Sequence, residues 1–586
     1  MAVNIKKFKI IYFAFILIFV PCYILSAPTG SPEDAIEELE RRQYEIEKRL
    51  REKEKLDAEH EKKEKKKDEI PVSDDDNKFF IKEIILQNDE LLSSGEKRRL
   101  LEPYTNKELA YNDLTVLVGS ITNLLIEKGY VTARVKVPLE QDISSGVFVL
   151  TIINGYISEV VPDKDEFKNR MAVFMAFPFF SGRSLNIKDL DYGIEQMNRL
   201  SSNNAEMKIH PGEEMGSSKI VVYNEPARWF FIETGFDNLG QKKTGENRGK
   251  LTVGLDNILC INDFIGFDFT HSFSDTDIKY NRSYTIYMMF PLGYWSFLAT
   301  YSLSQYKQHV EGLNTEFKTS GDDINKVFGV DRMLGRYKDH RFKAKSSLTL
   351  KTKENFLEDA RIETSSRNLT VFKFGIDYST FLFDGYFSTN IYYYRGLKLF
   401  GAYKDENNLE DDVPKAQFNK YEISIVWNKP FKIFEQSFVY MFNFSGQWAM
   451  ETLYSSEKIS MGDMNTVRGF KNDSLIGDRG FYIRNEFSVF DFSYLWKHLN
   501  GLRLYAGYDY GYAAEKVGRK ANYGRGDGSV MSWCAGLNYS AEIIDVNVIY
   551  SRHLFAPWFM IEKDYIVYVT ATLNCTSLFD EAVSLF

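Results

Sequence analysis

The chain has 586 residues, with 73 Lys and Arg against 82 Asp and Glu, and a mean hydropathy of −0.32. A hydrophobic fraction of 44% excludes wholesale disorder, the net charge of −9 argues against a nucleic-acid partner, and the polar mean hydropathy excludes a bundle of membrane helices. Aromatic residues make up 15% while prolines number only 14, a composition that favours a chain rich in β-strands.

The first 27 residues have the features of a secretory signal peptide. Three lysines precede an uncharged stretch over 10–25, and the small residues Ser26 and Ala27 follow it. The stretch is short for a bilayer span, which disfavours the alternative of an N-terminal membrane anchor. We therefore predict that residues 1–27 are removed during export and that the mature chain works outside the cytoplasm.

Residues 28–77 are dominated by charge. Between 33 and 70, 27 of the 38 residues are Asp, Glu, Lys or Arg, and no heptad seam of apolar residues is present. Opposite charges four residues apart, such as Glu37 and Arg41, are compatible with a solvated helix. The pattern predicts a polar, partly helical spacer.

Residues 78–160 have the pattern of a small α/β unit. Apolar residues at helical spacing from Leu114 to Leu125 predict a helix, with Asp113 as its N-cap and Gly129 as the C′ residue after its end. Three strands are predicted, over 81–86, 131–137 and 147–153.

Residues 161–227 have the pattern of a second unit of similar size. Asn186 is a candidate N-cap for a helix whose apolar residues run from Ile187 to Met197. Neither unit contains a cluster of catalytic residue types. Two strands are predicted, over 205–209 and 219–223.

Residues 228–586 repeat strand patterns in which apolar and polar side chains alternate. Over 372–378 the apolar residues alternate with Lys373, Gly375 and Asp377, and 283–306 reads as a hairpin that is apolar on one side only. Such strands suit a sheet with one face in lipid and the other in a wet lumen. The sheet is expected to close, because an open edge would leave unpaired backbone groups in hydrocarbon. At about 22 residues per strand and connection, the segment accommodates about sixteen strands.

No residue pattern of a catalytic or metal site is found. The seven histidines are scattered without an HExxH spacing, and no G-x-S-x-G sequence is present. Cys260, Cys534 and Cys575 are far apart, and we expect them to be unpaired small hydrophobic residues on strands. The sequence therefore predicts no catalytic residue, cofactor or metal, and indicates a conduit or a binding protein rather than an enzyme.

One polar, glycine-rich segment stands between predicted strands and contains Val467, Arg468, Gly469 and Phe470. On the strand that follows, alternation places Asp509 on the face expected to line the lumen. A pair between Arg468 and Asp509 would hold the segment inward through charge-assisted hydrogen bonds. The alternative is a solvated loop arginine.

These residues resemble the outer-membrane transporters of two-partner secretion, the TpsB family of the haemolysin activator and filamentous haemagglutinin transporter type. The family belongs to the superfamily of proteins that join POTRA domains to a barrel, and the resemblance extends along nearly the whole mature chain. The other segments that carry it are 102–109, 129–138 and 141–146 in the first unit, 185–190, 196–200 and 211–213 in the second, and 237–245, 255–257 and 293–297 in the first barrel hairpins.

The resemblance implies a transmembrane antiparallel β-barrel of about sixteen strands at 228–586, preceded by two periplasmic α/β POTRA domains at 78–160 and 161–227. Residues 28–77 would form a helical segment that plugs the pore, with a linker. In this family Val467 to Phe470 would be the tip of a long loop folded into the barrel lumen, with Arg468 bound to Asp509.

The resemblance also implies a function in the bacterial outer membrane. The pore would secrete a partner exoprotein that carries an N-terminal secretion domain, often an adhesin or cytolysin, after the POTRA domains capture it unfolded. The other expected partners are outer-membrane lipid, periplasmic chaperones and the barrel-assembly machinery. Three alternatives remain: a general insertase of the same superfamily, a passive porin, and a surface enzyme or adhesin anchored by a barrel.

Overall fold

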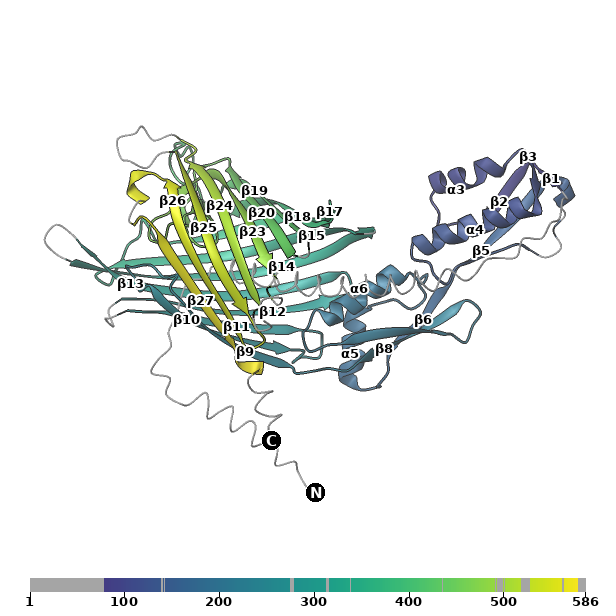
Figure 1. Cartoon of the computed structure of the whole chain (residues 1–586), viewed down its shortest axis with the longest axis horizontal. Helices are drawn as coiled ribbons and strands as arrows, with labels where there is room; N and C mark the ends of the chain where they lie inside the picture. The colour runs from purple at the N-terminus through teal and green to yellow at the C-terminus, as the bar shows by residue number, and fades with distance from the viewer. Residues whose placement is uncertain are drawn as a thin grey trace, which may run out of the picture.

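The computed structural model is a closed β-barrel with two small α/β units at one end, the second unit next to the barrel and the first farther out (Figure 1). The predicted signal peptide, the predicted plug helix and linker, and the last residues of the chain lie outside the described part. The described residues are 78–577 without 139–140, 142, 275–278, 312–315, 338, 435, 491, 493–498, 500, 518–526 and 561–562.

The first α/β unit packs one long helix against short strands. Helix α4 (Tyr111–Glu127) buries Leu117, Ile121 and Leu125 completely, at the spacing that the sequence predicted. Gly129 has a φ of +103° directly after the end of α4, which confirms its position as the C′ residue. One sheet has the order β2 (Glu83–Gln87), β5 (Val147–Ile153), β4 (Arg134–Lys136), with β2 parallel and β4 antiparallel to the central β5. A separate sheet pairs β1 (Lys78–Ile81) with β3 (Lys107–Ala110).

Several predictions for this unit are wrong in detail. The strand expected over 81–86 is split between two sheets, because the amides of Lys82 and Glu83 both turn to the carbonyl of Gly146. Asp113 is not the N-cap of α4. It lies in the first turn, where its carboxylate accepts a hydrogen bond of 2.8 Å from the amide of Ala110. The strand expected over 131–137 is only β4, since a turn precedes it. Helix α3 (Ser94–Leu101) was not predicted.

The second unit confirms the predicted helix cap. The Asn186 side chain accepts a hydrogen bond of 3.0 Å from the amide of Lys188 at the start of α6 (Ile187–Asn198). Helix α5 (Phe167–Ala176) was not predicted. The sheet has the order β6 (Tyr156–Pro162), β8 (Ser217–Asn224), β7 (Ala205–Pro211), so that the predicted strands are present and longer than expected.

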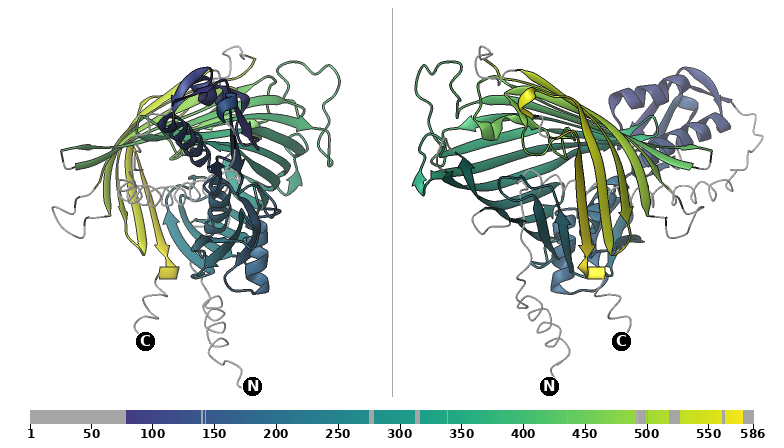
Figure 2. Two further views of the ribbon diagram at one scale, coloured as in Figure 1. Left: turned by 90° about the vertical axis from the view of Figure 1, so that its right-hand side faces the viewer. Right: turned by 60° about the vertical axis from the view of Figure 1, so that its left-hand side comes forward.

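The second unit is tied to the barrel by polar and aromatic contacts. Glu195 on α6 pairs with Arg336 at 2.6 Å and with Arg341 at 3.1 Å. The rings of Tyr192 and Tyr294 stack with their centroids 5.3 Å apart. Both arginines and Tyr294 lie at or beside turns of the barrel, so these contacts hold α6 against its rim (Figure 2).

The barrel is closed by sixteen long strands. The seventeenth labelled strand, β16 (Ala360–Arg361), has only two residues and is not counted among them. No helix among the described residues is long and apolar enough to cross a membrane. The long strands are β9 (Phe230–Asp237), β10 (Asn247–Asp256), β11 (Phe264–Phe273), β12 (Tyr280–Leu292), β13 (Trp295–Glu311), β14 (Glu316–Tyr337), β15 (His340–Leu357), β17 (Arg367–Leu382), β18 (Gly385–Leu397), β19 (Asn419–Ile433), β20 (Gln436–Ala449), β23 (Arg479–Phe490), β24 (Leu502–Ala514), β25 (Gly528–Ser540), β26 (Ile544–Phe555) and β27 (Ile566–Asn574).

Alternation along the strands separates an apolar outer face from a polar inner face. In the hairpin of β12 and β13, Ile286 lies opposite Tyr301, and the two side chains are 49% and 40% exposed. The next position on each strand carries Thr285 and Ser302, which are buried and lie 3.1 Å apart at their hydroxyls. The predicted hairpin with one apolar side is therefore confirmed, and the outer face has the character of a lipid-contacting band.

The three described cysteines are unpaired, as predicted, but only one lies on a strand. Cys534 is buried on β25. Cys260 lies in the turn between β10 and β11, where its φ is +63°, and Cys575 directly follows β27. The expectation that all three occupy strands is therefore wrong for Cys260 and Cys575.

Candidate functional site in the barrel lumen

The connection between β20 and β23, residues 450–478, folds into a defined structure that we call the lumen loop. It contains a single helical turn, η4 (Ser455–Glu457), and a two-stranded ladder of β21 (Ile459–Met461) and β22 (Leu475–Gly477). The tip between those two strands is shaped by Asp463, whose carboxylate accepts hydrogen bonds from the amides of Asn465 and Thr466 at 2.7 and 2.8 Å. This turn directs the next four residues, 467–470, against the wall of the barrel.

Arg468 at the tip is almost fully buried and binds Asp509 of β24 through two parallel contacts. Its Nε lies 2.7 Å from one carboxylate oxygen and its Nη2 lies 2.7 Å from the other. The backbone amide of Arg468 also donates to Asp509, at 3.1 Å. The structure thus brings together the two residues that the sequence placed as a pair, in the fork geometry that makes arginine–carboxylate pairs strong and directional.

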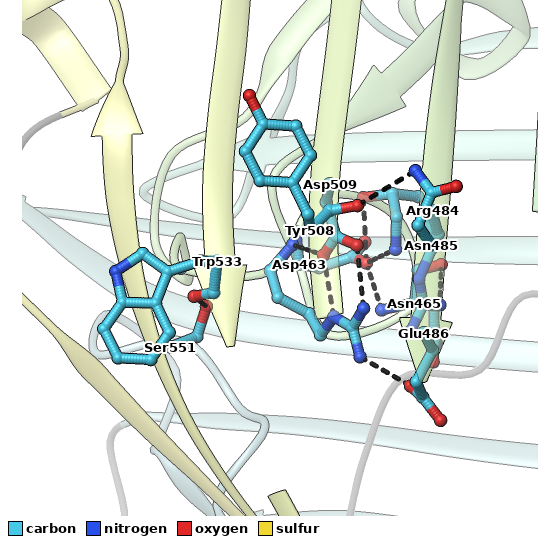
Figure 3. A network of polar contacts seen from close by, with 12 residues as sticks. Asp463, Asn465, Arg484, Asn485, Glu486, Tyr508, Asp509, Trp533 and Ser551 are labelled. Atoms are coloured by element: carbon cyan, nitrogen blue, oxygen red, sulfur yellow. Dashed lines mark hydrogen bonds and ion pairs between the residues drawn. The ribbon is translucent and has the colours of Figure 1, made fainter. Parts of the chain in front are cut away.

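A second carboxylate, which the sequence reasoning missed, completes the site. Glu486 of β23 accepts a hydrogen bond of 2.8 Å from Nη1 of Arg468 and lies 3.5 Å from Arg503. Asp509 and Glu486 come from neighbouring strands, and the dashed contacts converge between them (Figure 3). Alternation could have predicted this residue. Arg484 lies directly opposite Asp509, and Glu486, two residues along the same strand, is on the same face as Arg484.

The other residues of the predicted tip pack against apolar residues of the loop and the wall, or bind a tyrosine of the wall. Val467 and Phe470 are buried in a cluster with Met461 and Val530. Gly469 has a φ of +97°, and an added Cβ would lie 3.1 Å from the backbone of β26, so the close approach of the loop to the wall requires glycine here. Tyr568 of β27 accepts from the amide of Gly469 at 3.2 Å and donates to the carbonyl of Phe470 at 2.5 Å.

The start of the loop is fixed at a separate place on the wall. Glu457 is buried and pairs with Lys351 of β15 at 2.7 Å and with Lys420 of β19 at 3.6 Å. Its carbonyl accepts hydrogen bonds from Lys420 and Gln447, both at 3.0 Å. The lumen loop is therefore held at two separate regions of the barrel wall.

The chemistry of this site is that of an anchor. The charges of Arg468 and Arg503 face those of Asp509 and Glu486, so the buried group is balanced. Among the described residues, no group of three or more His, Cys, Asp or Glu is placed to hold a metal ion. The arrangement can hold a loop against the inner wall of a barrel, and release of the loop would require both carboxylates to be separated from the guanidinium.

Sequence comparisons place the chain in one family. Residues 216–539, more than half of the chain, match the family model for the haemolysin secretion/activation protein ShlB/FhaC/HecB. Residues 79–155 match the ShlB-type POTRA domain, and residues 156–211 match another POTRA domain.

Individual relatives agree with the family model. The outer membrane transporter CdiB of Dickeya dadantii is 30% identical over 409 residues, which cover 70% of this chain and 72% of that protein. The hemolysin transporter protein ShlB of Serratia marcescens is 30% identical over 380 residues, which cover 65% of this chain and 67% of that protein.

A solved structure extends the likeness to the fold as a whole. CdiB from Escherichia coli matches with a TM-score of 0.79 and 25% identity, over 94% of this chain and 100% of that chain. The closed sixteen-strand barrel, the two POTRA domains and the family match together fix the identity. The chain belongs to the ShlB/FhaC/HecB family of TpsB transporters and is a two-partner secretion pore of the bacterial outer membrane, with its POTRA domains in the periplasm.

Proposed function

We propose that this pore secretes a large exoprotein with an N-terminal secretion domain, that it has no catalytic activity of its own, and that Arg468 is required for export. Two of its relatives are named hemolysin transporters, from Serratia marcescens and Proteus mirabilis, which supports a secreted protein as the cargo. The observation that carries the proposal is the buried Arg468, which holds a loop inside a closed barrel whose periplasmic end carries docked POTRA domains.

The proposed path begins at the POTRA domains, for which we propose the limits 78–160 and 161–227, with the barrel at 228–586. Strand β7 lies at an edge of the second POTRA sheet, where an extended partner chain can add a further strand. The partner then threads through the lumen after the plug segment proposed within 28–77 has left it. Folding of the partner outside the cell would bias its movement outward.

The role of Arg468 is tested by Arg468→Ala. We expect export of the partner to fall to background while the barrel still inserts, because the loop tip loses the cation that Asp509 and Glu486 both hold. Secreted partner is measured in the medium, and surface-folded barrel is measured by protease protection and gel mobility.

Two matched variants sharpen the result. Arg361→Ala makes the same change at an exposed arginine in the short segment of β16, and should leave export intact. Arg468→Lys keeps the charge without the fork and should give intermediate export. Full export by Arg468→Ala with normal barrel levels would remove the proposed role.

A further inference from the structure

The barrel closes at the shortest ladder between its long strands. Strands β27 and β9 meet over only five residue pairs, whereas β9 with β10 and β26 with β27 each pair over eight. We call the pairing of β27 with β9 the seam. Side chains extend the pairing at both ends. At one end the side-chain amide of Asn238 donates to the carbonyl of Val567 at 2.8 Å and accepts from the amide of Val569 at 2.9 Å. At the other end the hydroxyl of Thr576 accepts from the amide of Ile232 at 2.7 Å.

The tip of the lumen loop contacts one side of the seam through Tyr568. This tyrosine lies on β27, is 1% exposed, and uses its hydroxyl as both acceptor and donor toward the backbone of Gly469 and Phe470. These two backbone groups are buried away from solvent. Loss of the hydroxyl would therefore leave the amide of Gly469 and the carbonyl of Phe470 without this hydrogen-bond partner.

The residues directly after the tip contact the other side of the seam. Lys471 pairs with Glu246 at 3.1 Å, and the side-chain oxygen of Asn472 accepts from the amide of Lys242 at 2.9 Å. Glu246 and Lys242 lie in the connection between β9 and β10. Four consecutive residues of the loop, 469–472, therefore bind the last strand and the first hairpin at once.

We propose that Tyr568 is a positioning residue and that the lumen loop acts through it as a strap across the seam, which keeps the barrel closed while the partner passes. This inference rests on the proposed role of the Arg468 loop. Arg468 fixes the loop to β23 and β24, Tyr568 carries that restraint to β27, and residues 471 and 472 carry it to the first hairpin. The loop thus adds contacts where two long strands of the barrel share the fewest residue pairs.

The first test is hydrogen exchange of the full-length transporter in nanodiscs, with Tyr568→Phe compared with the parent. We expect amides of β9 and β27 to exchange roughly tenfold faster, as follows from the loss of buried hydrogen bonds of ordinary strength, while β17 and β18 stay unchanged. Glu457→Gln is the matched control, since it weakens the same loop at β15 and β19, far from the seam. Unchanged exchange at the seam in Tyr568→Phe, or equal change in both variants, would overturn the proposal.

The second test asks whether closing the seam restores export. Phe236 and Ala571 lie directly opposite each other across the seam, so cysteines at these positions can form a disulfide. In a background with Cys260, Cys534 and Cys575 changed to Ser, we expect Tyr568→Phe to reduce export several-fold and the seam disulfide to restore it until it is reduced.

A single cysteine at either position should not restore export. Tyr568→Phe with low export that the disulfide leaves low would place the defect in the loop rather than the seam and would overturn the strap. A strap failure of this kind leaves the Arg468→Ala result intact, so the two proposals fail separately. The charge exchange Lys471→Glu with Glu246→Lys gives a further check, because it should keep seam exchange near the parent while each single change raises it.

Discussion

Arg468 is buried because two carboxylates on neighbouring strands share it. Taking a guanidinium out of water costs several kcal/mol unless it is paired and hydrogen-bonded, and here Asp509 and Glu486 together offset this desolvation cost. Asp509 supplies three contacts and is fully buried, whereas Glu486 supplies one and shares its other oxygen with Arg503. The two acids should therefore differ in their importance.

This difference gives an ordered prediction for the two acids. Asp509→Ala should destabilise the loop attachment by about 3–5 kcal/mol, because it leaves the guanidinium without its main partner. Glu486→Gln should cost about 1–2 kcal/mol, because the amide oxygen can still accept from Nη1. The temperature at which the folded barrel loses its fast gel mobility should fall more for Asp509→Ala than for Glu486→Gln. The reverse order would contradict the assignment of Asp509 as the main anchor.

A second residue-scale prediction concerns pH and the first POTRA domain. The pKa of Glu96 is lowered from 4.5 to about 2, chiefly by its contact with Lys128 at 2.8 Å and then by hydrogen bonds from Ser93. Because the folded pKa lies below the unfolded one, this carboxylate stabilises the fold above about pH 4.5, and that stability is lost as the pH falls toward 2.

Glu96→Gln tests this linkage. At pH 7 we expect the variant to lower the protection of α3 amides by about 1 kcal/mol, the usual worth of an N-terminal cap. The difference from the parent should shrink as the pH falls from 4.5 to 2, since the carboxylate of the unfolded chain is protonated in this range and the folded carboxylate only near pH 2. Exchange measurements quenched after labelling at each pH provide the comparison, and a difference that stays constant with pH would exclude the role assigned to this carboxylate.

The sequence predicted part of the site because alternation is a strong rule within a strand. It placed Asp509 toward the lumen and Arg468 in a loop that could reach it. Tyr568 could not be found in this way, since its contact joins residues 98 positions apart and depends on how the barrel closes. Contacts between a loop and a distant strand follow from tertiary structure rather than from local periodicity.

At the scale of elements, the joint between the two POTRA domains depends on the end of one helix and the start of another. The amide of Ile187 donates to the carbonyl of Gly129 at 2.9 Å, and the side chain of Asn186 donates to the carbonyl of Lys128 at 3.2 Å. The C′ residue of α4 therefore lies directly against the N-cap of α6. A Cβ at position 129 would lie 2.2 Å from the side-chain oxygen of Asn186.

Gly129→Ala should therefore disrupt this joint as well as the helix end. We expect a loss of about 1 kcal/mol from the left-handed backbone, and more from the displaced Asn186 cap. Hydrogen exchange should accelerate at the ends of both α4 and α6. Gly119→Ala on the same helix is a suitable control, because a Cβ there would meet no atom within 4 Å outside the backbone of its own helix. Equal exchange in the two variants would contradict the proposed joint.

Helices and strands were predicted well where apolar periodicity marks a buried face, and poorly where an element buries no side chain or depends on a tertiary contact. Helix α4 and strand β5 follow from periodicity, and Gly129 follows from the need for a residue that tolerates a positive φ. Helix α3 was missed although Ser93 and Glu96 form a capping box, because the helix is charged and buries no side chain. The split at Lys82 reflects a tertiary hydrogen bond that no local pattern encodes.

At the scale of the whole molecule, a polar-lined barrel and an attached pair of POTRA domains form one connected body. Glu195 links α6 to Arg336 and Arg341 at the barrel rim, and the lumen loop reaches from β15 round to the first hairpin. Composition indicated the barrel from its aromatic residues and scarce prolines, and alternation indicated its two faces. Strand lengths were less predictable, because β14 has 22 residues and extends well past the length that a bilayer requires.

The central claim, that this chain is the export pore for a partner exoprotein, is tested by the amount of partner in the medium. A candidate exoprotein with an N-terminal secretion domain is expressed with this chain, or without it, in cells that lack other transporters of the family. We predict that the partner reaches the medium only when the chain is present, and that the levels of unrelated outer-membrane barrels do not change. A partner retained in the periplasm despite a surface-folded transporter would contradict the account, and a fall in unrelated barrels on loss of the chain would favour an insertase instead.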